Sequence, residues 1–87
     1  MSFFVYLIVS KRNNKYTSYV GYTSNLKNRL ELHNSSKGAK FTRGRLWKLI
    51  YKKKYKNKSL AMKEEYLLKN NFKLRNEIKK SYIKNVK

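Results

Sequence analysis

The chain has 87 residues, which is enough for one compact domain with a thin core and too few for two. It carries 23 Lys and Arg against four acidic residues, a formal net charge of +19, and an excess of this size indicates a polyanionic partner such as a nucleic acid. The absence of cysteine excludes a disulfide framework, a zinc knuckle and a thiol nucleophile, and it fits a cytoplasmic protein.

The apolar pattern predicts two strands at the start of the chain. Residues 3–9 form a continuous aromatic and β-branched run, far shorter than the roughly 20 residues of a membrane span and typical of a central strand buried on both faces. We therefore expect no membrane partner. A turn over residues 10–17 leads to a second strand over residues 16–22, in which Gly21 marks a close backbone approach or the strand end.

A short helix and a basic loop follow the hairpin. Residues 23–25 offer N-caps for a helix over residues 26–34, in which leucines and the histidine recur at helical spacing. Residues 35–45 form the basic loop, and its glycines, Gly38 and Gly44, are free to take positive φ and to let the backbone approach a phosphate.

The rest of the chain returns to a strand and then to helices. The predicted elements are a strand over residues 46–55 and helices over residues 58–71 and 74–86. Alternation predicts that Trp47, Leu49 and Tyr51 share one face of the strand. The predicted order is therefore β-β-α-β-α-α, an α+β fold.

The small number of acids restricts the chemistry. Only Glu31, Glu64, Glu65 and Glu77 are available, whereas a two-metal nuclease site usually needs three or more clustered carboxylates. The single histidine, His33, also excludes a ribonuclease scheme with one imidazole as base and another as acid. A nuclease built from this chain is expected to use one metal ion.

Four side chains could carry phosphoryl chemistry. Arg29 and His33 are four residues apart, so they project from neighbouring turns of one helix face as a cation beside a proton acceptor. Tyr6 and Tyr19 lie on the paired strands. Each has a plain alternative, since an isolated Arg or His is often an ordinary surface residue and strand tyrosines usually serve packing.

Two adjacent acids lie on the helix over residues 58–71. Its expected apolar stripe consists of Leu60, Ala61, Leu67, Leu68 and Phe72. Glu64 falls within that stripe and Glu65 at its rim. A carboxylate that faces the core needs a metal or a partner, and an ion pair between Glu65 and Lys69 is the alternative to a metal.

Together these residues resemble the GIY-YIG nuclease family over about residues 3–75. The ordered matches are Val5-Tyr6-Leu7, Tyr19-Val20-Gly21, residues 19–29, His33-Asn34, residues 37–44 and Ser59-Leu60-Ala61-x-x-x-Glu65. The likeness is closest to the small stand-alone members and extends more distantly to excision-repair incision subunits. In the first motif, Phe4 and Val5 replace the Gly and Ile that give the family its name, and the segment between the two tyrosines is slightly long.

The resemblance implies a small three-stranded antiparallel sheet flanked by helices, in one nuclease domain over residues 1–87. Its core would span about residues 3–75, and a basic helix over about 74–86 would close it. The implied catalytic residues are Tyr6, Tyr19, Arg29, His33 and Glu65. By resemblance, Glu65 holds one divalent metal, Mg²⁺ or Mn²⁺, and Arg29 binds the scissile phosphate. Either tyrosine could be the base, and we favour Tyr6 relayed through His33.

The expected function is a metal-dependent endonuclease that hydrolyses DNA in repair or in processing of branched or damaged DNA. The expected nucleic-acid contacts are Tyr22, Lys27, Lys37, Lys40, Thr42, Arg43 and Arg45. Specificity would come from the basic loop, the last helix or a protein partner, and the protein would work in the cytoplasm, on the nucleoid if it is bacterial. The alternative is a non-catalytic nucleic-acid-binding module, for example a ribosome-associated one.

Overall fold

The structure, a computed structural model, describes residues 2–86 and confirms the predicted order of elements. The elements are β1 (Phe3–Arg12), β2 (Lys15–Thr23), α1 (Leu26–Asn34), the 3₁₀ helix η1 (Lys40–Thr42), β3 (Lys48–Tyr55), α2 (Lys58–Lys69) and α3 (Phe72–Val86). Only η1 was not predicted as a regular element. In the described part of the chain, every helix is too short or too polar to cross a membrane.

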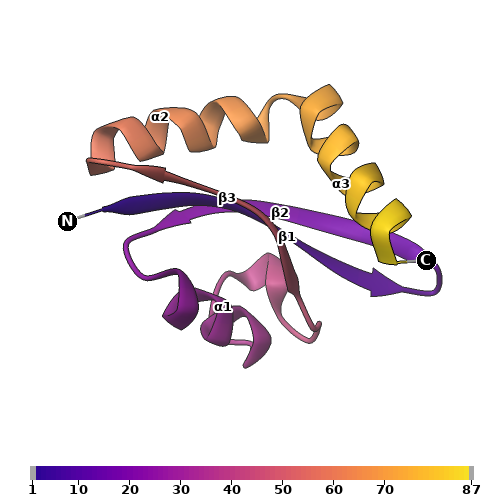
Figure 1. Cartoon of the computed structure of the whole chain (residues 1–87). Coiled ribbons are helices and arrows are strands. Elements are labelled where there is room, and N and C mark those ends of the chain that lie inside the picture. Colours follow the sequence, from indigo (N-terminus) through magenta and orange to yellow (C-terminus); the bar gives the residue numbers. More distant parts are fainter. Residues whose placement is uncertain (1, 87) are drawn as a thin grey trace.

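One antiparallel sheet with the strand order β2-β1-β3 organises the fold, and β1 is central as predicted. Helices α2 and α3 lie against one face of the sheet, whereas α1 lies on the other (Figure 1). The strands of the hairpin are longer than expected, because Arg12 pairs with Lys15. Asn13 and Asn14 form the turn with φ of 52° and 65°, a left-handed geometry that asparagine tolerates well and that tight hairpins require.

The core has two clusters, one on each face of the sheet. Val5 and Leu7 of β1 pack with α2, whereas Tyr6 and Ile8 point to the α1 side and pack with Trp47. This division follows from the strand period of two, which sends successive side chains to opposite faces. The division places Tyr6, but not its neighbours, on the face that carries α1.

The facing predicted for the third strand was wrong at one residue. Tyr51 pairs with Leu7, and Leu49 pairs with Ile8, so Ile50 is an extra residue in β3. Such a bulge interrupts the alternation of side chains. Leu49 and Trp47 therefore face α1, while Tyr51 packs on the α2 side.

The buried face of α2 is narrower than predicted. Ala61 and Leu68 are buried, but the other members of the expected stripe are exposed, namely Leu60, Leu67 and Phe72. Glu64 and Glu65 lie between the buried positions and are both half-buried. Helix α2 begins at an Asn57 cap, whose side chain accepts a hydrogen bond from the backbone N–H of Leu60 at 2.8 Å. The helix therefore carries both acids over the sheet.

Candidate active site

The central feature of the site is a buried hydrogen bond between a strand and a helix. The hydroxyl of Tyr6 on β1 lies 2.8 Å from Nε2 of His33 on α1. Both side chains are almost inaccessible to solvent. The sequence predicted an exchange of protons between these two residues, and the structure brings them into direct contact.

Two glycines make room for this pair. Gly21 lies opposite Tyr6 in the sheet, and a Cβ on Gly21 would lie 2.6 Å from Cζ of the tyrosine. A Cβ on Gly38 would lie 3.0 Å from Cε1 of His33. Gly21 therefore marks a close approach, as predicted. Gly44 has the expected positive φ of 74°, but Gly38 does not, and its role is to leave space for the imidazole.

A threonine sets the tautomer of the histidine. Nδ1 of His33 lies 2.9 Å from Oγ1 of Thr42, and the Thr42 hydroxyl donates its own proton to the carbonyl of Ala39 at 2.9 Å. Oγ1 can then only accept a hydrogen bond from Nδ1–H. A neutral imidazole with a proton on Nδ1 has a lone pair on Nε2, so Nε2 accepts the proton of Tyr6.

Thr42 was expected to contact nucleic acid, but in the structure its side chain is buried beside His33. Its side chain is 0% exposed, and its hydroxyl is already engaged by His33 and by the carbonyl of Ala39. The indole of Trp47 donates to the Thr42 carbonyl at 2.9 Å, and the backbone N–H of Trp47 donates to the Asn34 side chain. These bonds hold η1 against the end of α1. Thr42 is thus a structural support of His33.

Burial keeps both groups of the central pair neutral. Burial, reinforced by the neighbouring Tyr19 phenol, raises the pKa of Tyr6 to about 12, although the Arg29 guanidinium acts in the opposite direction. Burial, with a smaller effect of Arg29, lowers the pKa of His33 below its usual 6.5. At neutral pH the pair therefore consists of an intact phenol and a neutral imidazole.

The other three predicted catalytic residues surround this pair. The ring centroids of Tyr19 and His33 lie 5.2 Å apart. The charge of Arg29 acts on both members of the pair, and that of Glu65 acts on Tyr6. Arg29 is exposed and borders an open polar pocket of about 350 Å³ with Tyr22 and other side chains. Tyr6, Tyr19 and His33 therefore lie against one another, while Arg29 on α1 and Glu65 on α2 act on Tyr6 through their charges.

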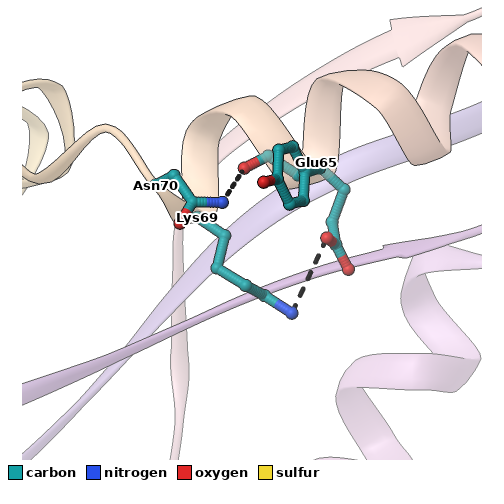
Figure 2. Close-up of polar contacts among 4 residues, drawn as sticks. Glu65, Lys69 and Asn70 are labelled. Carbon is teal, nitrogen blue, oxygen red and sulfur yellow. Dashed lines mark hydrogen bonds and ion pairs between the residues drawn. The ribbon is translucent and has the colours of Figure 1, made fainter.

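Glu65 makes the ion pair that the sequence offered as its alternative role. Its Oε1 lies 3.7 Å from Nζ of Lys69, and Figure 2 shows the two side chains meeting on one side of α2. The Lys69 side chain is 57% exposed, so this long pair contributes at most about 1 kcal/mol. The Glu65 side chain is 18% exposed, which leaves its carboxylate accessible to a cation.

Glu64 points to a different part of the molecule. It lines a pocket with Tyr55 and Leu67, and after burial it is the main cause that raises the pKa of Tyr55. Between the two acids, Glu65 is the one whose charge reaches the Tyr6 hydroxyl.

The donor set around Glu65 suits one hydrated divalent cation. The described residues contain no group of three or more His, Asp or Glu side chains that could hold a metal ion. Mg²⁺ keeps several of its water ligands and commonly binds through one or two carboxylates together with substrate phosphates. A single accessible carboxylate, such as that of Glu65, fits that requirement.

Most of the predicted nucleic-acid contacts are accessible. The exposed ones are Lys27, Lys37, Lys40 and Arg43. Tyr22 is half-buried and packs partly against the core. Arg45 is also half-buried, because it donates to the Ser10 hydroxyl at 3.2 Å and lies over the Trp47 ring.

The sequence reasoning missed two residues near the site. One is Thr42 in its role beside His33. The other is Phe41, which is 58% exposed and stacks on Tyr19 with ring centroids 6.0 Å apart. An aromatic residue between cations in a loop with two glycines was the available signal for Phe41.

Comparison with known proteins gives a match over most of the chain. Residues 2–79 match the family described as the GIY-YIG catalytic domain. A UPF0213 protein of Oceanobacillus iheyensis is 48% identical over 67 residues, which cover 76% of this chain and 74% of that protein. A UPF0213 protein of Streptococcus pneumoniae is 54% identical over 52 residues, 59% of this chain and about half (52%) of the relative. The solution NMR structure of a UPF0213 protein from Bacillus halodurans is 34% identical, covers 94% of this chain and 85% of that chain, and has a TM-score of 0.49.

Proposed function

The chain belongs to the GIY-YIG family of nucleases, and from this premise we propose that it is a metal-dependent endonuclease that hydrolyses DNA phosphodiester bonds. We propose branched or damaged DNA as its substrate and the cytoplasm as its location. The observation that carries the proposal is the buried Tyr6–His33 hydrogen bond, with the charges of Arg29 and Glu65 beside it.

The proton path follows from the direction of the hydrogen bonds. A water oxygen forms a bond to phosphorus while the bond from phosphorus to a sugar oxygen breaks. The water gives a proton to the Tyr6 oxygen as the Tyr6 proton passes to Nε2 of His33, and the departing oxygen takes a proton from solvent. His33 then carries the extra proton until solvent removes it.

The two proton transfers are coupled to the attack. Burial raises the pKa of the Tyr6 phenol to about 12 and lowers the pKa of His33, so transfer of the phenol proton to the imidazole before the reaction is unfavourable. A free phenolate is therefore not the resting base. Tyr6 acts as a relay that accepts one proton while it donates another.

Charge stabilisation would come from Arg29 and from the cation held by Glu65. The planar guanidinium of Arg29 matches two oxygens of a phosphate and offsets the negative charge that grows during attack. A divalent cation bound to Glu65 supplies further positive charge for the phosphate and the departing oxygen when it is present. The exposed cations of the basic loop, such as Lys40 and Arg43, would hold the flanking backbone.

Cleavage assays with a matched pair of tyrosine variants test the proposal. Labelled linear, nicked, flap and four-way-junction DNA is incubated with Mg²⁺, Mn²⁺ or chelator. We expect cutting that chelator abolishes, and a loss of roughly a hundredfold or more in Tyr6→Phe. Tyr82→Phe, on α3, is the control and should cut normally.

Two results would count against the nuclease proposal. If wild-type protein binds DNA but cuts none of these substrates with either metal, the chain is a binding module. If Tyr6→Phe cuts as fast as the control, the buried pair serves only packing.

A further inference from the structure

Phe41 forms the outer layer of an aromatic stack that leads from the site to solvent. Tyr19 packs edge-on against His33, and Phe41 lies nearly parallel to Tyr19, at an interplanar angle of 22°. Phe41 itself is 58% exposed. Its neighbours Lys40 and Arg43 are exposed cations. A single exposed apolar residue is common, but this one extends a catalytic tyrosine and is flanked by positive charge.

The same ring borders an open pocket of about 370 Å³ beside β2, which is an edge strand. The side chains around this pocket are Ser18, Tyr19, Val20, Phe41, Lys69 and Arg75. Its aromatic wall comes from Tyr19 and Phe41, and its cations come from α2 and α3. An apolar ring face with nearby cations is complementary to a nucleobase and its phosphate.

Arg75 adds an independent indication of an anion. Within the described residues, its Nε is buried and has no hydrogen-bond partner. The guanidinium lies over the Phe72 ring, with its carbon 5.6 Å from the ring centroid, and its planar fork of N–H donors suits a phosphate in the pocket that it lines. Lys69, in the same pocket, also contacts Glu65, so the pocket is linked directly to the proposed metal ligand.

A second pocket meets the site from another direction. It includes Arg29 and Lys58 with the polar Ser24, and it has a volume of about 350 Å³. Each pocket therefore includes one proposed catalytic residue: Arg29 lines one pocket, and Tyr19 lines the other. Both pockets combine cations with aromatic side chains, but only the pocket beside Phe41 includes the aromatic stack on His33.

We propose that Phe41 stacks an unpaired nucleobase next to the scissile phosphate, while Lys69 and Arg75 bind the phosphate of that nucleotide. This inference rests on the proposed nuclease function and names its substrate class, which is DNA with at least one unpaired nucleotide at the cut site. In a continuous duplex the faces of the bases are covered by their neighbours, so Phe41 could not stack on one.

A binding measurement in chelator tests the inference without relying on cleavage. The probes are a single-stranded thymidine oligonucleotide with one central 2-aminopurine and the same strand in a fully paired duplex. The proteins are wild type, Phe41→Leu, Phe41→Trp and the control Tyr66→Leu, which removes an exposed aromatic ring on α2 outside this pocket. Phe41→Leu keeps apolar bulk against Tyr19 but offers no ring for stacking.

For single-stranded DNA, we expect Phe41→Leu to weaken binding roughly tenfold or more and to remove the fluorescence change of 2-aminopurine. Phe41→Trp should restore both, Tyr66→Leu should behave as wild type, and duplex binding should change little. Equal affinities of wild type and Phe41→Leu for the single strand, or equal losses on single strand and duplex, would overturn the stacking site. In that event metal-dependent cutting by wild type would still support the nuclease. Failure of wild type to bind the single strand would also overturn the stacking site, and the cleavage assay described above would then decide the nuclease proposal.

Discussion

Replacing Thr42 with valine removes the hydroxyl that accepts from His33 and leaves the volume of the side chain nearly unchanged. Nδ1–H of His33 loses its acceptor in a buried place, whereas the carbonyl of Ala39 keeps its bond from the backbone N–H of Thr42. An unsatisfied buried polar group costs about 1–3 kcal/mol, so we expect a loss of stability of that order. His33 can lower the cost by moving its proton to Nε2, but it then no longer accepts the proton of Tyr6.

The expected effect on cutting follows from this change of tautomer. The hydrogen bond that selects the Nδ1–H form is worth about 1 kcal/mol, and the relay as a whole contributes roughly 10²- to 10⁴-fold. We therefore expect single-turnover cleavage by Thr42→Val to fall by roughly tenfold to a hundredfold. Thr42→Ser keeps the hydroxyl and should retain most of the activity.

Nitrogen NMR reports the tautomer without any dependence on cleavage, because His33 is the only histidine of the chain. Wild type and Thr42→Ser should show a protonated Nδ1 and an unprotonated Nε2, whereas Thr42→Val should shift toward a protonated Nε2. A wild-type protein with its proton on Nε2 would refute the reasoning. So would a Thr42→Val protein that keeps both the wild-type tautomer and the wild-type rate.

Three further predictions concern the acids, the glycines and pH. Glu65→Gln should abolish metal-dependent cutting but preserve DNA binding, whereas Glu64→Gln should retain substantial cutting. The reverse result in saturating metal would identify Glu64 as the metal ligand. Gly21→Ala places a Cβ 2.6 Å from Cζ of Tyr6, so it should lower the free energy of unfolding by about 1–3 kcal/mol and slow cleavage. The Cβ of Gly44→Ala meets no neighbouring atom, so this variant should lose only about 1 kcal/mol through backbone strain. Chemical denaturation would measure both losses. Folding lowers the pKa of His33, so its contribution to the free energy of unfolding should be fully present above pH 6.5 and should be lost as pH falls through the folded pKa. The rate of cutting should fall in the same direction. A cutting rate that rises on acidification would contradict a neutral imidazole as the proton acceptor.

The sequence by itself determined the features that depend on neighbours along the chain. Periodicity and caps are local, and they predicted the order of the strands and helices and the central place of β1. The spacing of Arg29 and His33 likewise placed both on one face of α1. The family motifs added Tyr6, Tyr19 and Glu65; the structure packs Tyr6 and Tyr19 against His33, and the charge of Glu65 acts on Tyr6.

Tertiary structure decided which atoms meet between elements, because that depends on register and on loop paths that have no period. One extra residue, Ile50, turned Tyr51 away from the face on which alternation had placed it. The path of the basic loop brought Thr42 beneath His33, although its composition had suggested a contact with nucleic acid. The same path left Phe41 at the surface on top of Tyr19. Each of these positions is fixed by contacts between residues that are distant in the chain, and a local sequence pattern does not specify such contacts.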